Sequence, residues 1–163
     1  MRPFCCFLLF VFLTACAADD GGIPGYRDLD LLQYDLPFTV QAPDSVAVRS
    51  SSLSGVMTDV TLVSPEDNYA VQVLASQATT NDMARLKAEQ LELVRGNRYF
   101  ERIVAETTDG FLFENRIDTL ATFGFRHIVY QGNREFVFQN ALSGTFTEQE
   151  ARRMYRAVGG RLE

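Results

Sequence analysis

The feature that most constrains the fold is the pair of apolar runs on either side of Gly132-Asn133. A two-residue loop there sets the register of an antiparallel hairpin. On one face, every predicted pair then carries at least one Phe or aliphatic side chain, so we expect that face to be buried. The pairs are Val129 with Phe136, His127 with Phe138, Phe125 with Asn140, and Phe123 with Leu142.

Two more hairpins are predicted upstream, after extended segments at residues 37–42 and 45–51. Residues 59–64 and 69–76 flank Pro65-Glu66-Asp67-Asn68, which has the residue types of a type I turn. Residues 99–106 and 111–117 flank Thr107-Thr108-Asp109-Gly110. A four-residue loop there pairs Val104 with Phe113 and Phe100 with Ile117. We prefer it to a two-residue Asp-Gly loop, because it buries more apolar surface.

Two helices complete the predicted domain. The first spans residues 82–95, with Thr80, Asn81 or Asp82 as its N-cap, and its apolar residues Met83, Leu86, Leu93 and Val94 fall near one side with Leu91 at the edge. The second starts at the capping box Thr147-Glu148-Gln149-Glu150, with Phe146 placed for a hydrophobic staple. Its apolar residues follow the spacing i, i+3, i+4, i+7, which predicts a helix packed on the sheet. They are Ala151, Met154, Tyr155 and Val158.

These elements predict the α+β class, an antiparallel β-sheet with packed helices. From Pro37-Phe38-Thr39-Val40-Gln41-Ala42-Pro43 to the start of the last helix, the chain resembles the PsbP-like family, which includes DcrB-like lipoproteins. The resemblance implies an α/β/α sandwich that binds or assists a larger assembly. It carries no functional residue over to this sequence except a lipidated cysteine.

That cysteine is Cys16. Leu13-Thr14-Ala15-Cys16 follows an apolar stretch at residues 4–13 and resembles the lipobox at which bacteria acylate a cysteine and cut before it. The apolar stretch is too short to span a bilayer, which takes roughly 20 residues. We therefore predict a signal peptide at residues 1–15, a lipidated and flexible tether at 16–33, and one globular PsbP-like domain at 34–163.

The predicted location is the bacterial cell envelope, with the protein held to the membrane by its lipid. Ala17, rather than Asp, follows the cysteine and resembles the pattern that permits transport to the outer membrane. The formal net charge of −6 argues against a nucleic-acid partner. An envelope protein is the expected partner, and the identity of that protein is open.

Candidate chemistry in the domain is sparse. His127 is the only histidine, and its strand parity with Phe125 and Val129 favours a structural role with Asn140 as its hydrogen-bond partner. The sequence has no common hydrolase, metalloprotease or nucleotide-binding signature, so we expect neither a cofactor nor a metal. The predicted function is a non-catalytic binding or assembly module. The alternative is a small envelope hydrolase using Glu114, Asp118 and His127.

Overall fold

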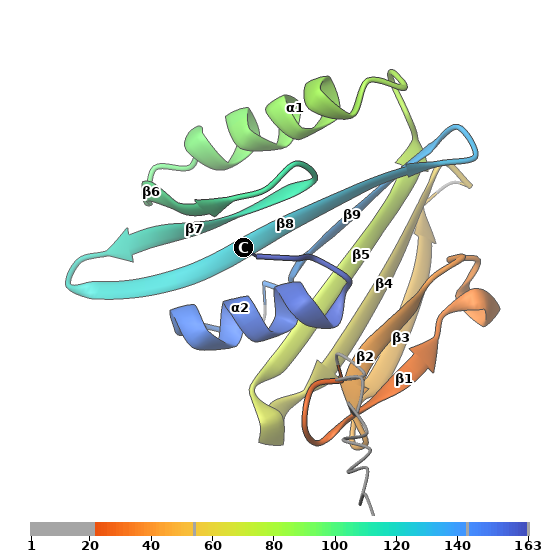
Figure 1. Ribbon diagram of the computed structural model, residues 1–163, viewed down its shortest axis with the longest axis horizontal. Helices are drawn as coiled ribbons and strands as arrows, with labels where there is room; N and C mark the ends of the chain where they lie inside the picture. The colour runs from red at the N-terminus through yellow and green to blue at the C-terminus, as the bar shows by residue number, and fades with distance from the viewer. Residues whose placement is uncertain (1–21, 54, 143, 163) are drawn as a thin grey trace, which may run out of the picture.

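The computed structural model describes residues 22–53, 55–142 and 144–162 of the 163-residue chain. Within them lie a seven-stranded antiparallel sheet in the order β3-β4-β5-β9-β8-β7-β6, a separate β1–β2 hairpin and two α-helices (Figure 1). The predicted α+β class is confirmed. The strands are β1 (Tyr26–Asp30), β2 (Thr39–Pro43), β3 (Ala47–Leu53), β4 (Met57–Ser64), β5 (Tyr69–Gln77), β6 (Phe100–Glu106), β7 (Gly110–Ile117), β8 (Leu120–Gln131) and β9 (Arg134–Asn140). The helices are α1 (Met83–Arg95) and α2 (Glu148–Ala157), with short 3-10 turns η1 (Leu32–Tyr34) and η2 (Pro65–Asp67).

The folded domain begins before Tyr34. β1 pairs with β2 along its whole length, from Tyr26 opposite Pro43 to Asp30 opposite Thr39, and Leu31 is fully buried. The predicted tether is therefore corrected for residues 26–33. Residues 26–30 are ordered by pairing with β2, which a local pattern does not reveal, and the turn η1 follows at Leu32–Tyr34. The predicted signal peptide, Cys16 and the tether as far as residue 21 lie outside the described residues. Among the described helices, none is long and apolar enough to cross a membrane.

The β8–β9 hairpin turns at Gly132 and Asn133, whose φ angles of 60° and 63° suit a two-residue primed turn. Val129 pairs with Phe136 and His127 with Phe138, as predicted. The ladder ends at Arg126 and Gln139, so the two further predicted pairs, Phe125 with Asn140 and Phe123 with Leu142, do not form. The reason is that the chain after β9 stays with β5: Asn140 pairs with Val71, and the Ala141 N–H donates to the Ala70 carbonyl.

The other two hairpins are also present. Ser64 pairs with Tyr69 across η2, as the turn residues predict. In the β6–β7 hairpin, Glu106 pairs with Phe111, so the preferred four-residue loop is correct at the turn. Two irregularities then shift the register, and Phe100 pairs with Asn115 instead of Ile117. A β-bulge adds one residue to one strand without any marked sequence signal, so it escapes pattern reading.

Both helices form where predicted. Asp82 caps α1, accepting from the backbone N–H groups of Ala84 and Arg85, and Thr147 and Glu150 form the full capping box of α2. In α1, however, Leu91 is buried and Leu93 is 69 % exposed, the reverse of the prediction. Consecutive helical residues point about 100° apart. With Val94 facing the sheet, Leu93 turns towards solvent.

The helices cover opposite faces of the sheet. Residues of α1 pack with Phe111, Phe113 and Ile128, whereas residues of α2 pack with Leu112 and Phe125, which point the other way. The β1–β2 hairpin lies on the α2 side, where Phe38 meets the rings of Phe136 and Phe138 edge-on. The β7–β8 region is thus sandwiched between helices, while the described residues place no helix on the α1 side of β3, β4 and β5 (Figure 1).

Candidate functional site

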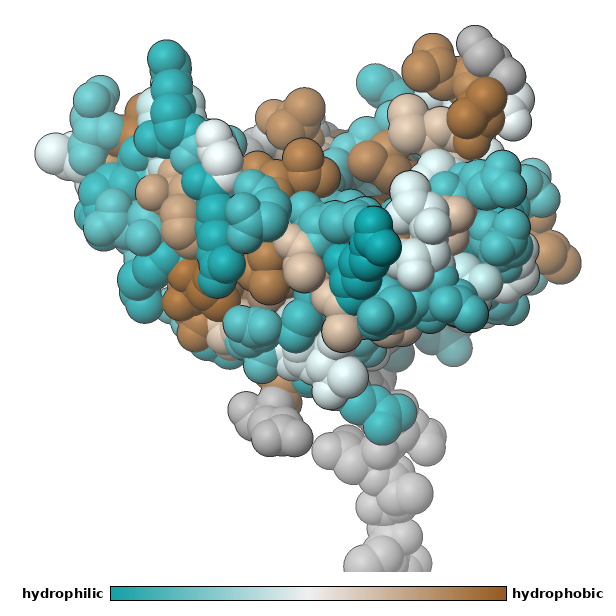
Figure 2. Space-filling model, turned by 90° about the horizontal axis from the view of Figure 1, so that it is seen from above, coloured by the Kyte–Doolittle hydropathy of each residue, from teal (hydrophilic) through white to brown (hydrophobic). Residues whose placement is uncertain are grey.

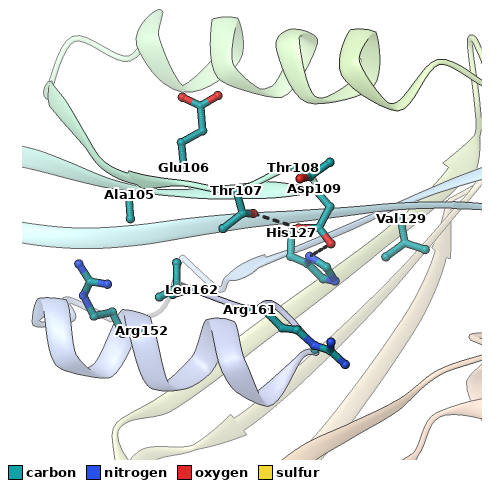
Figure 3. Close-up of a pocket in the computed structure, with 11 residues that line it drawn as sticks. Ala105, Glu106, Thr107, Thr108, Asp109, His127, Val129, Arg152, Arg161 and Leu162 are labelled. Atoms are coloured by element: carbon teal, nitrogen blue, oxygen red, sulfur yellow. Dashed lines mark hydrogen bonds and ion pairs between the residues drawn. The ribbon is translucent and has the colours of Figure 1, made fainter.

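A cleft of about 900 Å³ opens on the α2 side of the sheet, between the β6–β7 turn and the C-terminal segment (Figure 3). Its floor is β8, its sides are the β6–β7 turn and α2, and the segment after α2 runs along it. Most of its lining side chains are polar or charged. They are Ala105, Glu106, Thr107, Thr108, Asp109, His127, Val129, Arg152, Arg161 and Leu162, with Gly159.

His127 lies at the bottom of this cleft and is only 6 % exposed. Its ring packs between Phe138 and Tyr155, with centroids 5.6 and 5.7 Å away. Its Nδ1 faces Asp109 Oδ2 at 3.7 Å, an ion-pair separation too long for a direct hydrogen bond. Asp109 is held in place by the Ile128 N–H, which donates to its carbonyl at 2.7 Å.

Burial lowers the pKa of His127, and the nearby Asp109 carboxylate opposes this only in part. The ring is therefore neutral at pH 7. The carboxylate beside Nδ1 favours the tautomer that carries the proton there, which leaves Nε2 as an acceptor. Gly159 puts no side chain near Nε2, since even an added Cβ would lie 3.9 Å away. The site thus offers an uncharged hydrogen-bond acceptor on a ring that is packed between Phe138 and Tyr155.

Tyr155 and Thr107 join α2 to the β6–β7 turn. The Thr107 hydroxyl donates to Asp109 Oδ1 at 3.0 Å and lies 2.7 Å from the Tyr155 hydroxyl, which must then donate to it. Burial raises the pKa of Tyr155 to about 12, so it keeps that proton at neutral pH. Both hydroxyls are occupied, and neither is free to act as a nucleophile.

The charged residues at the rim are mostly engaged elsewhere. Arg152 is held by Glu148 on the same helix, with its Nε 2.8 Å from a carboxylate oxygen. Glu106 points away from the cleft towards α1, where it pairs with Lys87 at 2.9 Å, and Arg161 points past the end of α2 (Figure 3). The cleft therefore suits a polar, uncharged group better than an anion that needs converging arginines.

Two expectations about site residues are corrected. Asn140 is not the partner of His127, because its side chain accepts from the Phe125 backbone N–H at 3.2 Å. Glu114, Asp118 and His127 do not converge either. His127 pairs with Gly110, whereas Glu114 lies four residues further along β7, about 13 Å away at the usual strand rise. Asp118 lies beyond it, in the β7–β8 turn.

Glu114 has a structural partner set instead. It is 2 % exposed and paired with Arg102 and Arg116 on β6 and β7. The site residue that the sequence did not reveal is Asp109, which was seen only as part of a turn signal. No local pattern relates it to His127, because a turn and a strand are brought together here by the β7–β8 pairing. In the described part of the chain, no group of three or more metal-binding side chains is present.

The fold and the cleft define an α+β domain in which a buried histidine lies beside a carboxylate at the bottom of a polar cleft. Comparisons of the chain with protein-family models, with curated proteins and with solved structures found no match.

His127 should make stability depend on pH. The pKa of His127 is lower in the folded state than the ordinary 6.5. Between these two pKa values the unfolded chain binds more protons than the folded chain, so stability rises with pH there. As pH falls through 6.5, the parent should lose up to about 1.4 kcal/mol per pH unit more than His127→Gln does. Urea unfolding of both proteins at pH 7.5, 6.5 and 5.5 measures this. The variant should be the less stable of the two at pH 7.5. If the unfolding free energies of the two proteins change with pH in parallel, the pKa of His127 does not differ between the folded and unfolded states.

Proposed function

We propose that this protein is a lipid-anchored component of the bacterial cell envelope, at the outer membrane, whose PsbP-like domain is a non-catalytic binding or assembly module. Its partner is an envelope protein that places a polar, hydrogen-bond-donating group in the His127 cleft. The observation that carries this proposal is the cleft itself, where Asp109 faces Nδ1 of the one histidine and Nε2 is open to the cleft.

The first sixteen residues support the proposed anchor. Leu13-Thr14-Ala15-Cys16 closes an apolar stretch too short to span, and all three cysteines of the chain fall within this region. Acylation of Cys16 would use the last of them. The PsbP-like assignment is supported by the layering of α1 and α2 on opposite faces of an antiparallel sheet.

Binding is favoured over catalysis because the hydroxyl groups beside His127 are already bonded to one another and to Asp109. A hydrolase is the second candidate, since an Asp–His pair facing a cleft is also what a general base requires. In that case, Asp109 and His127 would act on a water molecule. Glu114 and Asp118 would have no part. Hydrolysis of nitrophenyl esters that is lost in His127→Gln, with the fold intact, would favour this candidate.

The proposal is tested by crosslinking in intact membranes. Ala105 points into the cleft (Figure 3), so Ala105→Phe should fill it and abolish the crosslinked partner species. Ala88→Phe is the matched control, because Ala88 is exposed on α1 across the sheet. Cys16→Ser should leave the protein uncleaved or release it from carbonate-washed membranes.

The proposed binding cleft and the proposed lipid anchor can each be contradicted separately. A partner species that survives Ala105→Phe as well as it survives Ala88→Phe would remove the cleft from the binding site. A Cys16→Ser protein that stays wholly with washed membranes at unchanged gel mobility would place the anchor elsewhere. Thermal midpoints of all variants establish that they are folded.

A further inference from the structure

The two edges of the large sheet differ in how they are protected. Edge strands usually carry bulges, Lys, Pro or inward charges that prevent further pairing. β6 has two register irregularities and the charged residues Glu101 and Arg102. β3 is less protected: its seven residues pair with β4 in unbroken register, and Arg49 is its only charged residue.

The side chains of β3 are also open to solvent. On the face of the molecule drawn in Figure 2, hydrophilic residues predominate and hydrophobic ones lie in separate groups between them. Six of its seven residues are exposed and only Val48 is partly buried, so its outer edge is open within the described structure. Its centre is a run of small side chains, Ser50-Ser51-Ser52. An incoming strand can approach such an edge without steric hindrance.

We propose that β3 pairs with β3 of a second copy of this chain, antiparallel about a two-fold axis through Ser50. This register uses all seven residues. Arg49 lies opposite Ser51 of the second copy, Val48 opposite Ser52, and Ala47 opposite Leu53, which is 66 % exposed in the single chain. Pairing two seven-stranded sheets at this edge makes one continuous sheet.

The charges on the two copies match in this register. Within one chain, Ser51 pairs with Asp59 of β4, so the three side chains Asp59, Ser51 and the incoming Arg49 share one row on one face. Two strand spacings, about 10 Å, separate the backbones of Asp59 and the incoming Arg49. The small Ser51 between them lets the guanidinium reach across. Arg49 has no ion-pair partner among the described residues, and the Asp59 oxygens accept only from Thr61 and Gln72. Symmetry forms this pair twice.

The two-fold axis is perpendicular to the sheet, so it keeps the β1–β2 hairpins of both copies on the same side. This orientation suits two copies anchored to one membrane, a step that rests on the proposed function. Anchoring would also concentrate the chains and favour a small interface. The pairing itself needs no anchor.

Disulfide trapping tests the register in the full chain. In Ser50→Cys, the two new thiols face each other at the axis, so copper-phenanthroline should give a dimer that reductant removes. Ser52→Cys is the matched control: its two copies lie four residues apart along the strands, about 13 Å, beyond disulfide reach. Dimer formed by the parent through its own cysteines is the background. Three results would overturn the proposal: equal trapping at both positions, trapping in Ser52→Cys alone, or no trapping in a Ser50→Cys protein whose new thiol reacts with maleimide.

A charge exchange tests the Arg49–Asp59 contact in the Ser50→Cys background. Arg49→Asp and Asp59→Arg should each lower the trapped fraction about fivefold, because each puts like charges together twice. The double variant Arg49→Asp/Asp59→Arg should restore it, since the opposite charges meet again. Thermal midpoints check that Asp59→Arg still folds. A double variant no better than the single ones would mean that these residues do not meet. If no dimer is trapped but Ala105→Phe still abolishes the crosslinked partner species, the proposed function stands without the dimer.

Discussion

Met154→Asp is expected to remove α2 from the sheet and to cost at least about 3 kcal/mol of unfolding free energy. Met154 is fully buried, and its sulfur lies 3.4 Å from the Ala70 backbone nitrogen on β5. An aspartate there would bury a charge within the apolar cluster to which Met154 belongs. Urea denaturation followed by circular dichroism measures the loss.

Arg156→Asp provides the matched comparison, because it introduces the same residue two positions away on the exposed side of α2. Removing a cation near the C-terminus of a helix should cost less than about 1 kcal/mol. If both variants unfold at the same urea concentration as the parent, then α2 is not docked as the structure has it.

The elements that sequence reasoning predicted well are those that local chemistry specifies. The capping box needs only Thr147 and Glu150, and the Gly132-Asn133 turn needs only two residues that accept positive φ. Both place their neighbours correctly, including His127 opposite Phe138. Here the information lies within a few residues of the feature that it determines.

The predictions that the structure corrected share a different cause. β1 is ordered by β2, and the chain after Asn140 follows β5 instead of β8, so in both cases a distant strand decides. The site behaves in the same way. His127 could be singled out as the one histidine on a buried face, but its partner Asp109 comes from the turn before β7. Residue spacing cannot reveal a contact that the strand order creates.

Gly110→Ala is the second substitution with a large expected effect. Gly110 begins β7 and pairs with His127, and the Tyr155 side chain of α2 lies where a side chain at residue 110 would be. An added Cβ would overlap the Arg126 carbonyl oxygen and would lie 2.5 Å from the Tyr155 hydroxyl and 2.8 Å from its ring. Because one of these obstacles is backbone, β7 and β8 would have to separate. We expect a loss of about 3 kcal/mol.

Two further variants decide whether the Tyr155 hydroxyl is the main obstacle. Gly22→Ala should leave stability unchanged, since its Cβ would meet nothing closer than 4.0 Å. Tyr155→Phe removes the hydroxyl but leaves the ring and the Arg126 carbonyl. Gly110→Ala should therefore cost the same in that background as in the parent. If it costs almost nothing there, the hydroxyl was the only obstacle, and the close approach of β7 and β8 does not require glycine. A full cost in both backgrounds means that the close approach of Gly110 to β8 and to the Tyr155 ring requires glycine.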